Sequence, residues 1–143
     1  MGLFGSEPKE RQVLTSITAD EMAAILKDMG FSPEISTDSA GDPMIRLPVE
    51  GLKSLIFFYG ATGGRYESYQ YSAGFRMETK PSHEVVNEWN RKKRFGKVYL
   101  DSEEDPHIEM DISLSGGVQR EYISETVRTW RAVFGAFLRH IGY

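Results

Sequence analysis

The sequence contains no cysteine. Disulfide bonds, thiolate nucleophiles, iron–sulfur clusters and cysteine zinc sites are therefore excluded, and the composition suits a reducing compartment. Long apolar runs are absent as well, because the longest one, residues 55–59, is far shorter than the roughly 20 residues that span a bilayer. The N-terminus has no basic region followed by an apolar stretch, so no export signal is expected. These absences predict a cytoplasmic protein without a membrane partner.

The chain also lacks a surplus of positive charge. Its 17 Lys and Arg residues are outnumbered by 21 Asp and Glu residues, which gives a formal net charge of -4. A broad electrostatic contact with nucleic acid is therefore disfavoured, and we expect no nucleic-acid partner. No Gly-x-Ser-x-Gly or His-Glu-x-x-His motif occurs, and the three histidines are dispersed along the sequence. The sequence accordingly assigns no catalytic residue, no cofactor and no metal ligand.

The composition that remains is typical of a globular domain. The chain has 143 residues, of which 40% are hydrophobic and 27% charged, which is enough to bury one core without metals or cross-links. Residues 1–16 mix Gly, Ser, Pro and charges without apolar periodicity, so we predict a flexible N-terminal lead-in there. Residues 17–143 are predicted to form a single domain.

Apolar periodicity and turn residues divide this domain into helices and strands. A capping box, Thr18-Ala-Asp-Glu21, predicts a first helix that ends near Gly30, and Ser82 is a candidate N-cap for a second. Apolar residues repeat every three or four positions up to Ile141, which predicts a third helix. Period-two runs bounded by turns predict strands at residues 35–37, 44–47, 55–59, 66–77, 97–101 and 107–114.

The order of these elements indicates the fold class. Four successive strands joined by turns predict an antiparallel meander, and the last two strands form a hairpin. The full order is α-β-β-β-β-α-β-β-α, so we predict an α+β fold in which a twisted antiparallel sheet of about six strands packs against three helices.

Two stretches resemble a known family. Residues 87–101, NEWNRKKRFGKVYLD, and residues 106–117, PHIEMDISLSGG, are similar to the signature of the YbjN family of bacterial regulators. The resemblance implies a fold similar to the type III secretion chaperones, which commonly dimerise. Because those chaperones commonly dimerise, the resemblance also implies a homodimer here. It further implies a bacterial cytosolic protein without known catalysis.

The densest polar cluster lies in this signature and consists of Trp89, Asn90, Arg91 and Arg94. It is a candidate partner-binding patch, in which the two arginines recognise a carboxylate or phosphate by paired N–H donors and Trp89 supplies contact area. The structural alternative is that Trp89 anchors the core, Asn90 ends the helix and the basic run faces the negative end of the helix dipole.

A second candidate surface lies on the predicted last helix. Tyr122, Trp130, Phe134 and Phe137 form an aromatic stripe that is broad enough to serve a dimer or partner in addition to the core. The alternative is that the helix covers the sheet and buries these rings.

The predicted strand 107–114 places His107, Glu109 and Asp111 on one face. An imidazole and two carboxylates on one face are a candidate metal site. Neighbours on one face of a strand lie near 7 Å apart, however, which is too far for all three side chains to reach one metal ion easily. Cross-strand contacts with Lys97 and Tyr99 give a simpler explanation. Likewise Gly60–Gly64 lacks the Gly-Lys-Ser/Thr ending of a phosphate loop and predicts a glycine hairpin.

Together these observations predict a non-enzymatic, chaperone-like module that binds a protein or peptide partner of unknown identity. A small-ligand sensor is the alternative, and an unrecognised enzyme is a third.

Overall fold

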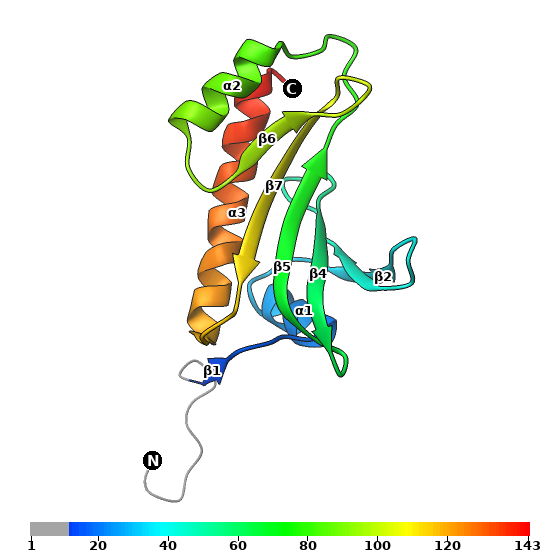
Figure 1. The fold of residues 1–143 in the computed structure, drawn as a ribbon, viewed down its shortest axis with the longest axis vertical. Helices are drawn as coiled ribbons and strands as arrows, with labels where there is room; N and C mark the ends of the chain where they lie inside the picture. The colour runs from blue at the N-terminus through cyan, green and yellow to red at the C-terminus, as the bar shows by residue number, and fades with distance from the viewer. Residues whose placement is uncertain (1–11) are drawn as a thin grey trace, which may run out of the picture.

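A six-stranded antiparallel sheet forms the centre of the computed structural model, which describes residues 12–143. The strands lie in the order β2-β3-β4-β5-β7-β6, and Figure 1 shows β4, β5, β7 and β6 side by side. The predicted α+β class and element order are confirmed. The bounds of the strands are β2 (Glu34–Thr37), β3 (Pro43–Arg46), β4 (Leu55–Thr62), β5 (Arg65–Gly74), β6 (Lys97–Leu100) and β7 (Pro106–Ser113).

Three helices accompany the sheet: α1 (Ala19–Asp28), α2 (His83–Lys92) and α3 (Arg120–Ile141). The predicted caps are confirmed, because Thr18 and Glu21 form a reciprocal capping box and the Ser82 hydroxyl accepts from the Val85 N–H. These side chains satisfy N–H groups that have no partner within the first turn. Among the described residues, no helix is both long and apolar enough to cross a membrane.

Helices α1 and α3 lie behind the sheet, α2 lies beside its β6 edge, and the face towards the viewer has no helix over it (Figure 1). Alternation along the strands matches this arrangement: in β5 the side chains of Tyr69, Tyr71 and Ala73 are buried, as their period of two predicts. Helix α3 crosses behind the sheet and adds Trp130 and Phe134 to the core. The core therefore lies between the sheet and the helix layer.

One polar contact is buried inside this core. The Thr126 hydroxyl lies 2.8 Å from the Tyr69 hydroxyl and 2.9 Å from the Tyr71 hydroxyl, and it donates to the Ile123 carbonyl at 2.7 Å. Burial raises the pKa of Tyr71 well above its ordinary value, so the phenol stays neutral. The contact joins α3 to the middle of the sheet.

Two strand ends differ from the sequence prediction by more than one residue. Strand β4 continues to Thr62, so only Gly63 and Gly64 form the turn before β5, and both have the positive φ that a tight hairpin of this kind requires. The predicted strand 66–77 ends early, at Gly74. The Asp105 carboxylate accepts a hydrogen bond from the Met77 N–H, which draws this segment away from the sheet.

A small second sheet was not predicted. Strand β1 (Val13–Leu14) pairs with β8 (Val118–Gln119), directly before α3. Strand β1 falls within the predicted lead-in of residues 1–16, most of which lies outside the described residues. Its two residues carry too little periodicity to indicate a strand, and pairing with a distant segment supplies the missing information.

Candidate functional site

The predicted partner-binding cluster lies where α2 ends and β6 begins; we call residues 89–98 the α2–β6 corner. Trp89 sits beneath it with 1% of its surface exposed. The Trp89 indole N–H donates to the Gly96 carbonyl at 2.8 Å, and the ring packs edge-on against Phe137. The structural alternative therefore holds for Trp89, whose ring offers no contact area to a partner.

Asn90 closes the edge of the sheet. Strand β6 pairs with β7 on one side only, so the backbone of Val98 points outward at the edge. The Asn90 Oδ1 accepts from the Val98 N–H at 3.0 Å, and the Asn90 Nδ2 donates to the Val98 carbonyl at 2.9 Å. The amide thus makes the two bonds that a further strand would make, and it blocks unwanted pairing here.

The basic side chains of the corner are exposed. Lys92 is bound to Glu88 at 2.6 Å, and this hydrogen bond lowers the pKa of Glu88. In contrast, Arg91, Lys93 and Arg94 form no ion pair with any residue in the range 12–143. The Arg94 guanidinium lies over the Phe95 ring, 4.9 Å from its centre, which is cation–π distance.

Phe95 is the unusual residue of the corner. Its side chain is 63% exposed, and its φ of 78° lies in the left-handed region that favours glycine. The neighbouring Gly96 explains the conformation: a β-carbon there would lie 2.8 Å from Ile108 and 2.9 Å from Val133, so the backbone must run close to the core. The turn into β6 therefore holds an aromatic ring out towards solvent.

A hollow of about 200 Å³ opens beside Phe95. Strand β6 covers only Pro106–Glu109 of β7, so the rest of the β7 edge is left without a strand neighbour. Helix α3 forms the other wall. The lining residues are Phe95, Met110, Asp111, Ile112, Tyr122, Glu125, Thr126 and Thr129. We call this space the Phe95 hollow.

The predicted aromatic surface on α3 requires a correction. Trp130, Phe134 and Phe137 are each 0% exposed, because α3 turns this stripe towards the sheet. Only Tyr122, at 46% exposure, remains at the surface, and it lines the Phe95 hollow. The structure thus brings Tyr122 together with the basic corner, two features that the sequence treated as separate.

A family comparison covers nearly the whole domain. The profile of YbjN, described as a putative bacterial sensory transduction regulator, matches residues 18–142. The chain belongs to the YbjN family. A comparison with curated proteins finds no match. The match confirms the predicted family, and the α2–β6 corner lies inside the matched range.

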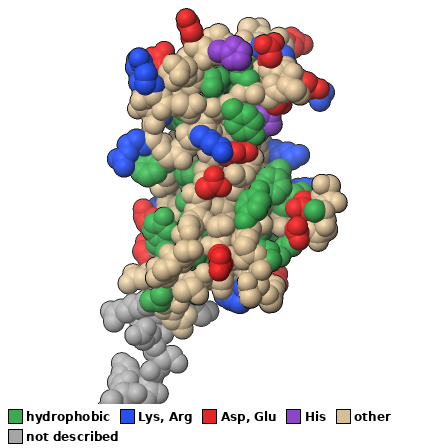
Figure 2. All heavy atoms as spheres, viewed as in Figure 1, with side chains coloured by type: hydrophobic (Ala, Val, Ile, Leu, Met, Phe, Trp, Pro, Cys, Tyr) green, Lys and Arg blue, Asp and Glu red, His purple; other side chains and the backbone are tan. Residues whose placement is uncertain are grey.

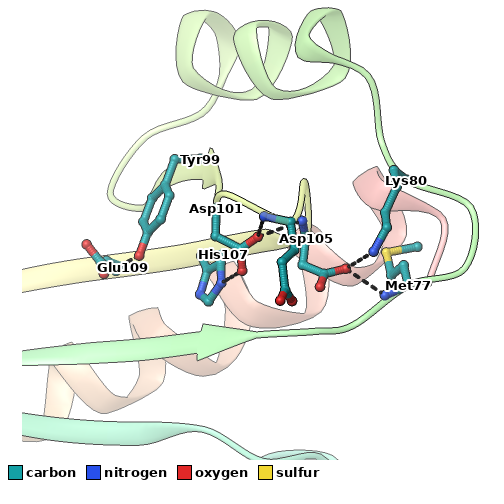
Figure 3. A network of polar contacts seen from close by, with 8 residues as sticks. Met77, Lys80, Tyr99, Asp101, Asp105, His107 and Glu109 are labelled. Carbon is teal, nitrogen blue, oxygen red and sulfur yellow. Dashed lines mark hydrogen bonds and ion pairs between the residues drawn. The ribbon is translucent and has the colours of Figure 1, made fainter.

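The second polar region of this YbjN chain lies at the β6–β7 hairpin (Figure 3). The His107 Nε2 lies 2.8 Å from the Asp101 Oδ2, and the imidazole stacks on the Tyr99 ring with 5.1 Å between ring centres. The hydrogen bond with His107, aided by the backbone N–H groups of residues 103 and 105, lowers the pKa of Asp101. The hairpin thus holds one flat pair of rings on the uncovered face.

Asp105 anchors the same hairpin from the other side. Only 6% of its side chain is exposed, and its Oδ1 accepts from the Lys80 Nζ at 2.5 Å and from the Met77 N–H at 3.0 Å. The Lys80 contact, followed by the Met77 bond, lowers the pKa of Asp105. This pair ties the segment before α2 to the β6–β7 turn.

The side chains considered for a metal do not converge. His107 is bound to Asp101, Glu109 accepts from the Tyr99 hydroxyl at 2.9 Å, and Asp111 accepts from the Gln70 amide at 3.0 Å. Within the part of the chain that the structure describes, no three such residues gather around one point. The simpler explanation from cross-strand contacts with Lys97 and Tyr99 is the one observed.

Sequence reasoning missed Phe95 and the hollow beside it. The one available signal was a phenylalanine between a basic run and a glycine. Such a pattern does not distinguish an exposed ring from a buried one, because exposure here depends on how closely Gly96 approaches Ile108 and Val133.

Proposed function

We propose that this protein is a non-enzymatic regulatory module of the bacterial cytosol that binds a segment of a partner protein at the α2–β6 corner. The observation that carries the proposal is Phe95, an exposed aromatic side chain in a left-handed conformation beside a hollow. Strained residues persist where the surrounding structure enforces them, and they are concentrated at binding and switch sites.

The chemistry of the corner indicates the kind of segment. Phe95 and Tyr122 offer aromatic contact area around the hollow, which suits an apolar side chain. Arg91, Lys93 and Arg94 are free to meet carboxylates, while Asp111 and Glu125 in the hollow are already held by Gln70 and Arg128. The proposed partner segment therefore combines an apolar anchor with acidic residues, and electrostatic attraction sets its orientation.

Trp89 and Asn90 support this surface without contacting the partner. Their hydrogen bonds to Gly96 and Val98 fix the backbone on both sides of the exposed ring. A site built on such a fixed backbone loses less conformational entropy when the partner binds. The chaperone-like role and the homodimer implied by the family resemblance stay predictions, and a size measurement of the pure chain tests the dimer.

A displayed library of random peptides, selected on the full chain, tests the proposal. We expect the selected peptides to combine an apolar residue with Asp or Glu. Arg94→Glu and Phe95→Ser should each weaken their binding at least tenfold in fluorescence anisotropy, because each removes one half of the contact. Matched controls are Arg46→Glu on β3 and Tyr59→Ser on β4, which change similarly exposed residues elsewhere.

Two outcomes would contradict the proposal. One is selection of peptides whose affinity is unchanged by both corner variants. The other is an equal loss of affinity in the corner variants and the controls, since such a loss does not depend on where the substitution lies.

A further inference from the structure

The uncovered face of the sheet carries a groove of about 420 Å³ that the proposed partner site does not use. Figure 2, drawn from the same side as Figure 1, shows hydrophobic and acidic side chains close together over the strands. Such a volume is within the range of small-molecule sites. The groove is lined by Lys53, Ser54, Leu55, Phe57, Ser72, Ala73, Gly74, Tyr99, His107 and Glu109.

One wall of the groove is a pair of flat rings. The His107 imidazole and the Tyr99 ring are parallel within 7°, and His107 is also held by Asp101. Gly74 forms the floor beneath, and a β-carbon at that position would overlap the imidazole. The side chains of Leu55 and Phe57 contribute apolar surface from β4. The middle of the groove therefore suits an apolar body.

A carboxylate stands at one end. The Glu109 side chain is 17% exposed, and its Oε2 accepts from the Tyr99 hydroxyl at 2.9 Å. Burial and the Glu109 carboxylate raise the pKa of Tyr99 to about 12, so the Tyr99 hydroxyl stays protonated and donates to Glu109. The only cation on Glu109 among residues 12–143 is Lys97, at 3.4 Å and 63% exposed. Because the Lys97 ammonium is exposed to solvent and lies 3.4 Å from the carboxylate, its attraction to Glu109 is weak, and another cation easily replaces it.

An ammonium group stands at the other end. Lys53 lines the groove just before β4 and forms no ion pair with any described residue. The register sets the spacing, since Leu55 lies opposite Ser72 and Ser72 opposite Glu109. Two strand spacings, about 10 Å, therefore separate Leu55 from Glu109, and Lys53 precedes Leu55 by two residues, about 7 Å further along the chain.

We infer that this groove binds a small zwitterion, a molecule with a carboxylate and an ammonium or guanidinium group on an apolar body. The carboxylate of the ligand meets Lys53, its cation replaces Lys97 at Glu109, and its body lies between Phe57 and the His107 ring. Charges of both signs at opposite ends of one groove select against molecules that carry only one of them, because one group of the protein then stays without a partner.

Three related molecules test the inference: 6-aminohexanoate, which carries both charges, hexanoate and hexylamine. Each is titrated into the isotope-labelled full chain, and amide shifts are followed by NMR. We expect saturable shifts around Ser72, Gly74 and Glu109 with 6-aminohexanoate, and at least tenfold weaker binding of the two molecules with a single charge.

Substitutions separate the two ends. Glu109→Gln should lower the affinity for 6-aminohexanoate to that for hexanoate, and Lys53→Met should lower it to that for hexylamine. Arg46→Met and Asp111→Asn, which lie outside the groove lining, are the controls and should leave it unchanged. Equal binding of all three molecules, shifts that map elsewhere, or no saturable shift in the tens of millimolar would overturn the inference.

Discussion

At the scale of single residues, Asn90 has a role that reaches beyond its own helix. Its amide satisfies the outward N–H and carbonyl of Val98, which an edge strand otherwise leaves to water or to another chain. Both hydrogen bonds to the Val98 backbone come from this one side chain, so a single substitution removes both. The residue that the sequence proposed for partner binding thus stabilises the sheet on which the partner surface rests.

Replacing Asn90 with Ala should therefore destabilise the protein. The loss of both hydrogen bonds at a partly buried edge should lower the free energy of unfolding by about 1–3 kcal/mol. Urea unfolding followed by circular dichroism measures the change. Asn87→Ala, an exposed position on the same helix, is the control and should stay within about 0.5 kcal/mol of wild type.

The carboxyl group of Asp105 makes the stability of the folded protein depend on pH. Its pKa is lowered in the folded state by Lys80 and the Met77 N–H. A carboxyl with a lowered folded pKa stabilises the protein above its unfolded pKa of about 4, and this contribution disappears as the pH falls through the folded pKa. Asp105→Asn should therefore melt below wild type at pH 7, and the gap in Tm should narrow below about pH 4.

The matched control for Asp105 is Glu103→Gln in the same turn, whose side chain is exposed. Its Tm should follow that of wild type at every pH. A gap between wild type and Asp105→Asn that stays constant from pH 7 to pH 3 would show that the carboxylate charge contributes nothing.

At the scale of elements, the connection between α2 and β6 combines strain with exposure. Phe95→Gly should relieve the left-handed strain and raise the free energy of unfolding by about 1 kcal/mol. The same change removes the exposed ring, so binding of the selected peptides should fall. Thermal melting and fluorescence anisotropy on one preparation measure both effects.

Another non-glycine residue with positive φ provides the comparison. Glu104 has a φ of 63° and lies in the turn between β6 and β7, away from the hollow. Glu104→Gly should stabilise the protein by a similar amount and leave peptide binding unchanged. If Phe95→Gly is stabilised and still binds at full affinity, the ring has no part in recognition.

At the scale of the whole molecule, Trp130 connects the helix layer to the sheet. Its ring stacks on Tyr71 with 5.3 Å between ring centres, and its indole N–H donates to the Ser54 hydroxyl at 3.3 Å. Because the buried side chains form one continuous core, we expect the sheet and the helices to unfold together.

Trp130→Ala should remove about 3–5 kcal/mol of stability, the cost typical of a large buried aromatic residue. Circular dichroism and tryptophan fluorescence from Trp89 should still give coincident unfolding curves. Tyr122→Ala, on the exposed part of the same helix, should cost far less. Separate transitions for the two probes would indicate that helix α2 and the sheet unfold independently.

Much of the fold followed from the order of the residues. The capping box at Thr18, the alternation through Tyr69 and Tyr71 and the hairpin before His107 are local patterns, and each predicted its element. The candidate sites were harder to predict from the sequence than the helices and strands. An aromatic stripe at helical spacing fits a core and a surface equally well, so Trp130 could not be assigned before its neighbours were known.

The sequence by itself determined which segments are helices and strands, because caps, turns and apolar periods act over a few residues. It also determined the family. The tertiary structure alone decided which side chains face solvent: it buried the α3 stripe, exposed Phe95 and placed Lys53 across the sheet from Glu109. These outcomes depend on contacts between residues far apart in the chain, and local patterns carry no information on such contacts until the sheet has assembled.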